Sequence, residues 1–188
     1  MQTRNRKRMQ LILLASLFVI PMALAAWLAG SGWIPDARSY GQGIVPQRSL
    51  ESVKVALDDG TTLDDGTTLD WHDPQWRWSV VAIPARQCAA RCMQQLDLVH
   101  RARISLNQNA RRVRLLYLGA PPTDPAAGEL MQHWQQGLDV DGGFAEWRPR
   151  SEDGVSVVLV KPDGIALTWY ADGFDASGLR KDLAKVTK

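Results

Sequence analysis

The two cysteines of the chain, Cys88 and Cys92, are the residues whose type and spacing could do chemistry. On a helix, side chains four positions apart share one face, and Cα atoms about 6 Å apart lie within the range that a disulfide can bridge. The positive end of a helix stabilises a thiolate, and Arg86 and Arg91 beside the pair add positive charge. The pair can therefore act in thiol–disulfide exchange or bind Cu(I), the soft ion that paired sulfurs select. The alternative is a pair of inert cysteines facing the core.

The predicted elements place this pair where a strand meets a helix. Residues 76–83 form a β-rich run that ends before a proline, as a buried strand does. Residues 88–107 carry apolar side chains at helical spacing without Pro or Gly. A second strand is predicted at 113–118 and a second helix at 124–136. The cysteines thus lie at the start of a helix that follows a buried strand.

The last part of the chain completes the predicted fold. Strands at 156–160 and 165–169 are joined by a Lys-Pro-Asp-Gly turn, and an amphipathic helix is predicted at 174–186. The first two strands need a crossover through a helix, whereas the last two form a hairpin. We therefore expect an α/β fold, a thioredoxin-like mixed sheet flanked by helices, preceded by one N-terminal transmembrane helix.

The N-terminal segment predicts a single-pass membrane anchor. Residues 1–10 contain four basic and no acidic side chains, and residues 11–29 carry no charge over a length that can span a bilayer. A cleaved signal peptide is the alternative. The positive-inside rule puts the N-terminus in the cytoplasm and the rest of the chain outside the bacterial inner membrane, in a periplasm where a cysteine pair can be oxidised.

The chain is expected to contain four segments. They are a cytoplasmic basic tail at 1–10, the anchor at 11–29, a Gly- and Pro-rich tether at 30–53, and a periplasmic thioredoxin-like domain at 54–188 with a tandem duplicated loop at 57–68. The formal charge is +2, from 22 basic and 20 acidic residues, and without the basic tail the remainder is mildly acidic. This balance disfavours nucleic acid as a partner.

From about Tyr40 onward the chain resembles the SCO/SenC proteins, and in particular the SCO-like membrane proteins encoded beside bacterial haem-copper oxidase assembly genes. The matching stretches are the Cys88 to Cys92 motif, Ser-Tyr-Gly at 39–41, Gly-Phe-Asp at 173–175 and residues 178–183. The resemblance implies a thioredoxin-like fold and a role in cytochrome c oxidase biogenesis, through Cu(I) delivery or thiol–disulfide exchange. It implies an oxidase subunit or another assembly factor as the partner, with Cys88 and Cys92 in the place of the two cysteine ligands.

Two departures from that family concern the metal site. Gln87, Ala89 and Met93 replace prolines around the cysteine motif. The third family ligand, a histidine, is matched by Asp153 or a near neighbour, and a carboxylate is a poor ligand for Cu(I). His72, in the segment before the first predicted strand, is the candidate replacement.

The sequence therefore predicts a membrane-anchored SCO-like protein that acts by thiol–disulfide exchange, transient Cu(I) handling, or both. As a thiol–disulfide oxidoreductase it would attack through Cys88 and resolve the mixed disulfide with Cys92. The alternative is a non-catalytic assembly or interaction module in which the disulfide only fixes the start of the helix. Phosphate-loop, serine-esterase and zinc-protease motifs are absent from the sequence.

Overall fold

The computed structural model describes residues 2–30, 39–58, 68–122, 124 and 127–188. The chain divides into two units, residues 1–38 and 39–188. The first contains α1 (Gln2–Gly30), a helix that includes Pro21 and the uncharged run at 11–29. Across these described ranges, no helix has both the length and the apolar character that a membrane span requires. The first part of the predicted tether, residues 31–38, lies outside the described residues.

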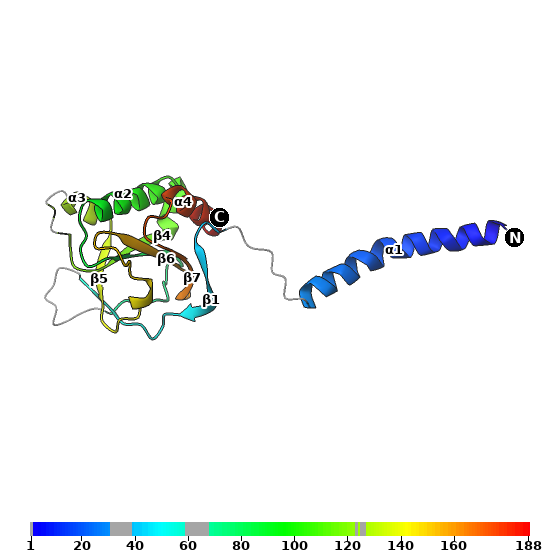
Figure 1. Cartoon of the computed structure of the whole chain (residues 1–188), viewed down its shortest axis with the longest axis horizontal. Helices are drawn as coiled ribbons and strands as arrows, with labels where there is room; N and C mark the ends of the chain where they lie inside the picture. Colours follow the sequence, from blue (N-terminus) through cyan, green and yellow to red (C-terminus); the bar gives the residue numbers. More distant parts are fainter. Residues whose placement is uncertain (1, 31–38, 59–67, 123, 125–126) are drawn as a thin grey trace. The chain divides into compact units, whose positions relative to one another are not determined.

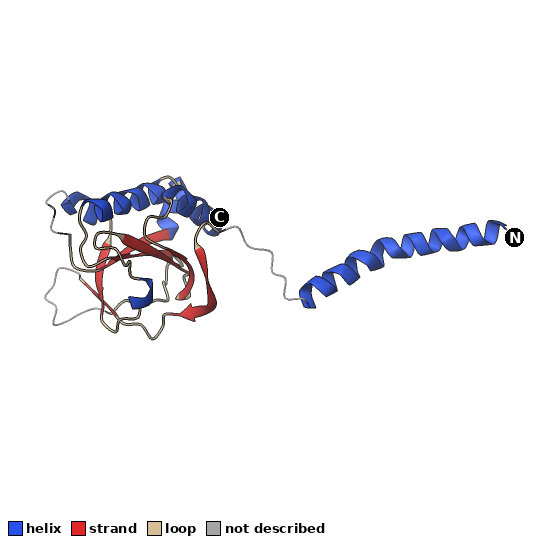
Figure 2. Cartoon of the chain, viewed as in Figure 1, coloured by secondary structure: helices blue, strands red, loops and turns tan. Residues whose placement is uncertain are grey.

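The second unit contains the remaining helices and strands (Figures 1 and 2). In chain order they are β1 (Gln42–Ser49), β2 (Val55–Leu57), β3 (Trp78–Pro84), α2 (Ala90–Ile104), the 3-10 helix η2 (Asn107–Arg112), β4 (Val113–Leu118), α3 (Ala127–Met131), β5 (Gln135–Asp139), the 3-10 helix η3 (Ala145–Trp147), β6 (Val155–Val160), β7 (Ile165–Tyr170) and α4 (Ala176–Val186). The described strands form one sheet in the order β1-β7-β6-β3-β4-β5-β2.

The centre of this sheet has the predicted mixed topology. β3 and β4 are parallel and are connected through α2, whereas β6 is antiparallel to both β3 and β7. The hairpin between β6 and β7 turns at Gly164, whose φ of 79° is a conformation that glycine adopts without steric penalty. The expectation of an α/β mixed sheet flanked by helices is confirmed.

The two faces of the sheet are covered differently. α2, α3 and α4 pack on one face, along the top of the domain in Figure 1, where Leu96 and Leu179 are fully buried. The other face is covered mainly by loops and η3, which bury the aromatic side chains of Trp71, Phe144 and Trp147. Each face thus has its own hydrophobic core, and the helix-side core is the one that contains the cysteines.

The predicted domain boundary at residue 54 is wrong, because the domain begins at Ser39. Part of the predicted tether forms β1, an edge strand paired with β7, and its side chains are mostly exposed, so it lacks the apolar pattern that marks a strand. Asp182 of α4 fixes the start of the domain by accepting hydrogen bonds from the Tyr40 backbone N–H (2.7 Å) and the Ser39 hydroxyl (3.0 Å).

The helix predicted at 124–136 is too long. The described part is the five-residue α3, and the chain then enters β5, which pairs parallel to β4 and antiparallel to β2. Sheet pairing on both sides of β5 overrides the local helical pattern, which is a weak determinant by comparison. Of the duplicated loop at 57–68, residues 59–67 lie outside the described part of the chain.

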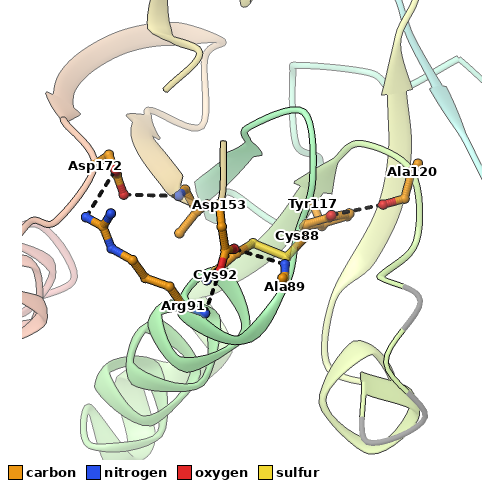
Figure 3. Close-up of a disulfide and its surroundings, with 9 residues drawn as sticks. Cys88, Ala89, Arg91, Cys92, Tyr117, Ala120, Asp153 and Asp172 are labelled. Atoms are coloured by element: carbon orange, nitrogen blue, oxygen red, sulfur yellow. Dashed lines mark hydrogen bonds and ion pairs between the residues drawn. A yellow bond between two sulfur atoms is a disulfide. The ribbon is translucent and has the colours of Figure 1, made fainter. Parts of the chain in front are cut away.

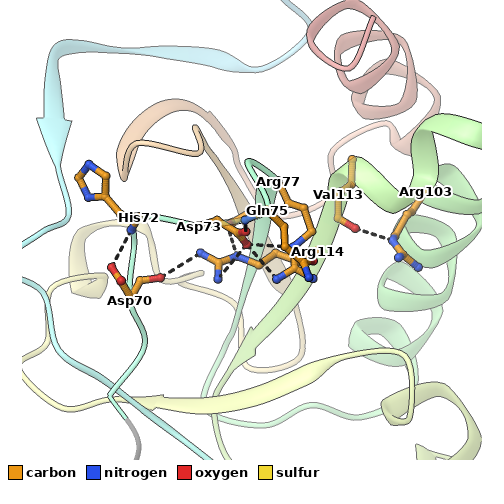
Figure 4. Close-up of polar contacts among 9 residues, drawn as sticks. Asp70, His72, Asp73, Gln75, Arg77, Arg103, Val113 and Arg114 are labelled. Atoms are coloured by element: carbon orange, nitrogen blue, oxygen red, sulfur yellow. Dashed lines mark hydrogen bonds and ion pairs between the residues drawn. The ribbon is translucent and has the colours of Figure 1, made fainter.

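A buried ion cluster closes the end of the sheet that carries the β6–β7 turn (Figure 4). The Asp73 side chain is 0% exposed, and its Oδ2 lies 2.9 Å from Arg77 Nη2 and 3.4 Å from Arg114 Nη1. Asp73 also anchors its own loop, because its backbone N–H donates to the carbonyl of Pro162 in the turn (3.1 Å). Arg114 Nε donates to the Ser79 hydroxyl (2.6 Å). We call this region, defined by Asp73, Arg77 and Arg114, the arginine end.

Candidate functional site: a disulfide at the start of a helix

Cys88 and Cys92 form a disulfide, with Cα atoms 5.0 Å apart (Figure 3). α2 begins at Ala90, so Cys88 precedes the helix and Cys92 lies in its first turn. Cys92 is fully buried in the helix-side core, whereas Cys88 is only partly buried at its edge. The predicted pairing is therefore confirmed, and Cys88 is the more accessible of the two sulfurs.

The backbone before the disulfide is held against the segment that leads into β6. The Ala85 N–H donates to the Gly154 carbonyl (2.9 Å), and the Gln87 N–H donates to the Glu152 carbonyl (3.2 Å). These two hydrogen bonds, together with the isolated bridge between Gln87 and Asp153, bring residues 152–154 alongside the cysteine loop. We call this region, defined by Cys88, Cys92 and Asp153, the disulfide end.

Asp153 caps α2 from a distant part of the sequence. Its carboxylate accepts hydrogen bonds from the backbone N–H groups of Ala89 (2.9 Å), Arg91 (2.9 Å) and Cys92 (3.1 Å). Partial desolvation raises the pKa of Asp153, but these three hydrogen bonds outweigh it and hold the pKa below its ordinary value. The positive end of α2 is thus occupied by a carboxylate.

This cap changes what the helix start does to the cysteines. The sequence analysis expected the helix end to stabilise a thiolate. In the structure the negative charge of Asp153 lies on the same N–H groups, including that of Cys92, and opposes a second negative charge nearby. Arg91 Nη2 lies 3.2 Å from Asp172 Oδ2, so this ion pair offsets part of the positive charge of Arg91. The Asp172 carboxylate also accepts a hydrogen bond from the Ser151 hydroxyl (2.8 Å). The site therefore favours the disulfide or neutral thiols over a strongly acidic thiol.

A cavity of about 750 Å³ opens beside Cys88. Its walls come from the cysteine loop, from the Gly119 to Pro122 segment after β4, and from Arg148 after η3. Tyr117 closes part of the floor, and its hydroxyl donates to the Ala120 carbonyl (2.9 Å). Burial raises the pKa of Tyr117 to about 12, so this phenol stays neutral and does not serve as a base at pH 7.

His72 does not lie near the cysteines. It pairs with Asp163 in the β6–β7 turn, at the start of β3, whereas Cys88 follows the end of β3. At about 3.3 Å per residue, the two ends of this seven-residue strand are roughly 20 Å apart. The His72 side chain is 57% exposed and faces Glu51, with Nδ1 and Oε1 3.8 Å apart.

The residues described do not fit a three-ligand Cu(I) site. They contain no group of three His, Cys, Asp or Glu side chains placed to hold a metal ion. Asp153 accepts from the Cys92 N–H, but its oxygens are used by backbone N–H groups and are hard donors. His100 stacks on His133, with ring centroids 4.1 Å apart, and both lie with α2 and α3 rather than at the disulfide.

Two features of the site were not predicted from the sequence: the capping role of Asp153 and the position of Arg148. One signal for the cap was available: Ala89 stands at the N-cap of α2 and has no side-chain acceptor, so the free N–H groups need an acceptor from elsewhere. No local pattern could have placed Arg148, because the loop after η3 reaches the cavity only through the fold.

Comparison with solved structures finds similarity at low identity. BsSco, a member of the Sco family of cytochrome c oxidase assembly proteins, is 13% identical, with 82% of this chain and 97% of that chain covered and a TM-score of 0.46. The copper-bound ScoI of Arabidopsis thaliana is 12% identical, with coverage of 78% and 97% and a TM-score of 0.49. Peroxiredoxin Q of Xanthomonas campestris is 14% identical, with coverage of 73% and 94% and a TM-score of 0.44.

No curated protein matches the chain. One family model does match, over residues 78–188, which is more than half of the sequence and includes the cysteine pair, Asp153 and the sheet from β3 to β7. This chain therefore belongs to the family described as the transmembrane-like, thioredoxin-like, C-terminal domain.

Proposed function

We propose that the protein carries out thiol–disulfide exchange through Cys88 and Cys92. The observation that carries the proposal is the asymmetry of the disulfide: Cys92 is fully buried, whereas Cys88 lines a cavity large enough for part of a substrate. Exchange needs one accessible sulfur to attack and a second sulfur close by to resolve the mixed disulfide.

In the proposed exchange, one disulfide is reduced while one dithiol is oxidised, and no other oxidant or reductant is needed. In the reduced protein, the Cys88 thiolate attacks one sulfur of a substrate disulfide, and the other substrate sulfur leaves as a thiolate that takes a proton from water. Cys92 then loses its proton and attacks the Cys88 sulfur, which releases the second substrate thiol. The substrate gains two electrons, and the protein dithiol becomes the Cys88–Cys92 disulfide. The same steps run in reverse oxidise a dithiol substrate.

The physiological setting that we propose is cytochrome c oxidase biogenesis, with an oxidase subunit or another assembly factor as the partner. The support is the sequence resemblance described above, in particular the Ser-Tyr-Gly stretch at 39–41 and residues 178–183. A chain with both Cys88 and Cys92 changed to Ser should fail to restore oxidase assembly in cells that lack the protein. Full restoration would contradict the proposal.

We also propose that the chain is held at the bacterial inner membrane by its N-terminal segment, with residues 39–188 in the periplasm. The support is the uncharged run at 11–29 after the basic tail, together with exposed apolar side chains on α1 such as Leu13, Leu17 and Phe18. Alkaline carbonate extraction should leave the full chain in the membrane pellet. Release of the full chain into the soluble fraction would contradict the anchor.

Copper handling is the second activity that the cysteine pair suggests, and the missing third ligand makes it testable. The reduced wild-type chain should compete for Cu(I) no better than a simple dithiol, because among the described residues no histidine joins the two cysteines in a three-ligand group. Asp153→His should add an imidazole beside Cys92 and raise the Cu(I) affinity by roughly tenfold or more. Tight binding by the wild type would show that the protein carries copper.

A structural disulfide is the competing function, and the full burial of Cys92 favours it. The reduction potential separates the two. Equilibration of the full chain in detergent with glutathione redox buffers should give a value nearer −200 mV for an exchange protein, whereas a value below about −300 mV indicates a structural bond. Cys92→Ser provides the matched test, because it should trap a mixed disulfide on Cys88, and Cys88→Ser should not trap one on Cys92.

A further inference from the structure

We infer that the cavity beside Cys88 selects disulfides whose thiol halves carry carboxylates. The selectivity in exchange rests on the proposed exchange function, whereas binding of carboxylates in the cavity can be tested without it. It follows from the charge, size and position of the cavity walls.

The first observation is that the cavity carries two arginines that have no acidic partner in the described part of the chain. Arg86 and Arg148 both line it and are exposed, and neither forms an ion pair with any of the described residues. Some other arginines of the domain form ion pairs, for example Arg91 with Asp172, so the two arginines of the cavity are distinguished by lining it without such a partner among the described residues. Free guanidinium groups on the walls of a cavity attract carboxylates and bind them in a two-pronged geometry.

The second observation concerns Asp139, the one acidic side chain among the described residues of the cavity wall. Asp139 has both carboxylate oxygens engaged, since Oδ1 accepts from the Gly143 N–H (2.9 Å) and Oδ2 from the Phe144 N–H (2.9 Å). These hydrogen bonds hold the Asp139 side chain against the backbone of the segment that follows β5, which leaves its carboxylate less able to pair with an arginine. The charged groups of the wall therefore carry a net positive charge.

The third observation is the size and remaining chemistry of the cavity. A volume of about 750 Å³ accommodates a group as large as a short peptide. Pro84, Pro121 and Pro122 provide a rigid apolar wall, and Gln87 provides an amide for polar groups of the ligand. Because Cys88 lies in the same wall, a ligand bound there presents its sulfur to the attacking residue. The ligand class is a peptide-sized thiol or disulfide with carboxylates.

Two sources share this chemistry, and the experiment separates them. The small-molecule source is represented by glutathione disulfide, and the macromolecular source by a cystine peptide with acidic residues beside the cysteine. Both are compared with the same peptide carrying lysines and with cystamine, a cationic disulfide. Rates of oxidation of the pre-reduced full chain are divided by the rates of dithiothreitol with each disulfide, which removes differences in intrinsic reactivity.

The normalised rate should be roughly tenfold higher for at least one anionic disulfide than for its cationic counterpart at low salt. Arg86→Glu and Arg148→Glu should each remove most of this preference. Arg150→Glu is the matched control, because it makes the same charge change two residues from Arg148 at an exposed position outside the cavity wall. Preference for glutathione disulfide identifies the small-molecule source, and preference for the acidic peptide alone identifies a protein partner.

Binding to the oxidised chain tests the site without any exchange. Calorimetric titration with S-methylglutathione, which cannot react, should show binding that its diethyl ester lacks and that Arg148→Glu abolishes. If this binding is observed but no disulfide exchange is detected, the binding site is supported and the exchange function is refuted. Equal rates for anionic and cationic disulfides, or an equal loss of preference in Arg150→Glu, would overturn the inference and leave the exchange function intact.

Discussion

An aspartate lies near each end of β3 and accepts hydrogen bonds or ion pairs from several donors, but the kind of donor differs between the two ends. At the arginine end, Asp73 is inaccessible and faces two guanidinium groups (Figure 4). At the disulfide end, Asp153 is only partly buried and accepts from backbone N–H groups (Figure 3). The first arrangement pairs a buried carboxylate with cations, whereas the second surrounds a carboxylate with uncharged backbone donors beside the disulfide. We therefore expect the first end to contribute mainly to stability and the second to the proposed exchange.

The largest effect is expected from breaking the arginine end. Asp73→Asn leaves Arg77 and Arg114 without their shared carboxylate, and the Arg114 side chain is only 10% exposed. Burial already lowers the pKa of Arg114, an effect that Asp73 opposes. Removing one partner of a buried ion cluster should lower the free energy of unfolding by about 3–5 kcal/mol. Urea unfolding followed by circular dichroism measures the change.

The same variant also tests the division of roles. Under conditions where Asp73→Asn remains folded, its normalised rate of disulfide exchange should equal that of the wild type, because the change lies roughly 20 Å from Cys88. A loss of stability below about 1 kcal/mol would show that water screens the cluster. A change in exchange rate in the folded protein would show that the two ends are coupled.

The second effect comes from removing the charge at the disulfide end. Asp153→Asn keeps an oxygen that can accept from the helix N–H groups, so stability should fall by only about 1 kcal/mol. Without the carboxylate, a thiolate at the start of α2 is less destabilised in the reduced protein, so the reduction potential should rise by about 30 mV, which corresponds to about 1.4 kcal/mol. Redox-buffer titration measures the potential. An unchanged or lower potential would contradict the electrostatic role of Asp153.

Local sequence signals were enough to predict the middle and end of the fold. The apolar run at 113–118 coincides with β4, and the Lys-Pro-Asp-Gly turn lies where the β6–β7 hairpin turns. β1 and β5 could not be predicted in this way. The exposed strand β1 has no apolar alternation, and β5 owes its conformation to the strands on either side of it. Strands of this kind are determined by tertiary pairing rather than by propensity.

In the candidate site, too, local features could be predicted from the sequence, whereas those that depend on tertiary pairing could not. Two cysteines four residues apart at a strand–helix junction predicted the disulfide that the structure contains. Asp153 lies 61 residues from Cys92, and its role depends on the pairing of residues 85–87 with 152–154. His72 was a reasonable candidate from sequence distance alone, but its pairing with the β6–β7 turn puts it at the opposite end of the sheet. The cysteines and histidines that could react or bind a metal can be found in the sequence, whereas the residues that contact them in the fold cannot.

Acid pH should weaken the disulfide end through Asp153. The pKa of Asp153 is lower in the folded protein than its ordinary value of 3.8, so its stabilising effect is complete well above that value. As the pH falls below about 4, the unfolded chain binds a proton first, and the stabilisation is lost as the pH passes through the folded pKa. The stability difference between wild type and Asp153→Asn should therefore shrink from pH 7 to pH 3. A difference that stays constant over this range would mean that the cap does not depend on charge.

The smallest effect should come from the ion pair that Arg91 makes with Asp172. The Arg91 side chain is 59% exposed and the two charged atoms lie 3.2 Å apart, so water screens much of their attraction. Exposed pairs contribute about 0.2–1 kcal/mol, and Arg91→Gln should lower stability by no more than this. Its effect on exchange should also be small, because Asp172 already offsets its charge, whereas Arg148→Glu changes a guanidinium with no acidic partner among the described residues. If Arg91→Gln instead slowed the reaction with anionic disulfides as much as Arg148→Glu, the selectivity would belong to the charge of the whole end of the domain and not to the cavity.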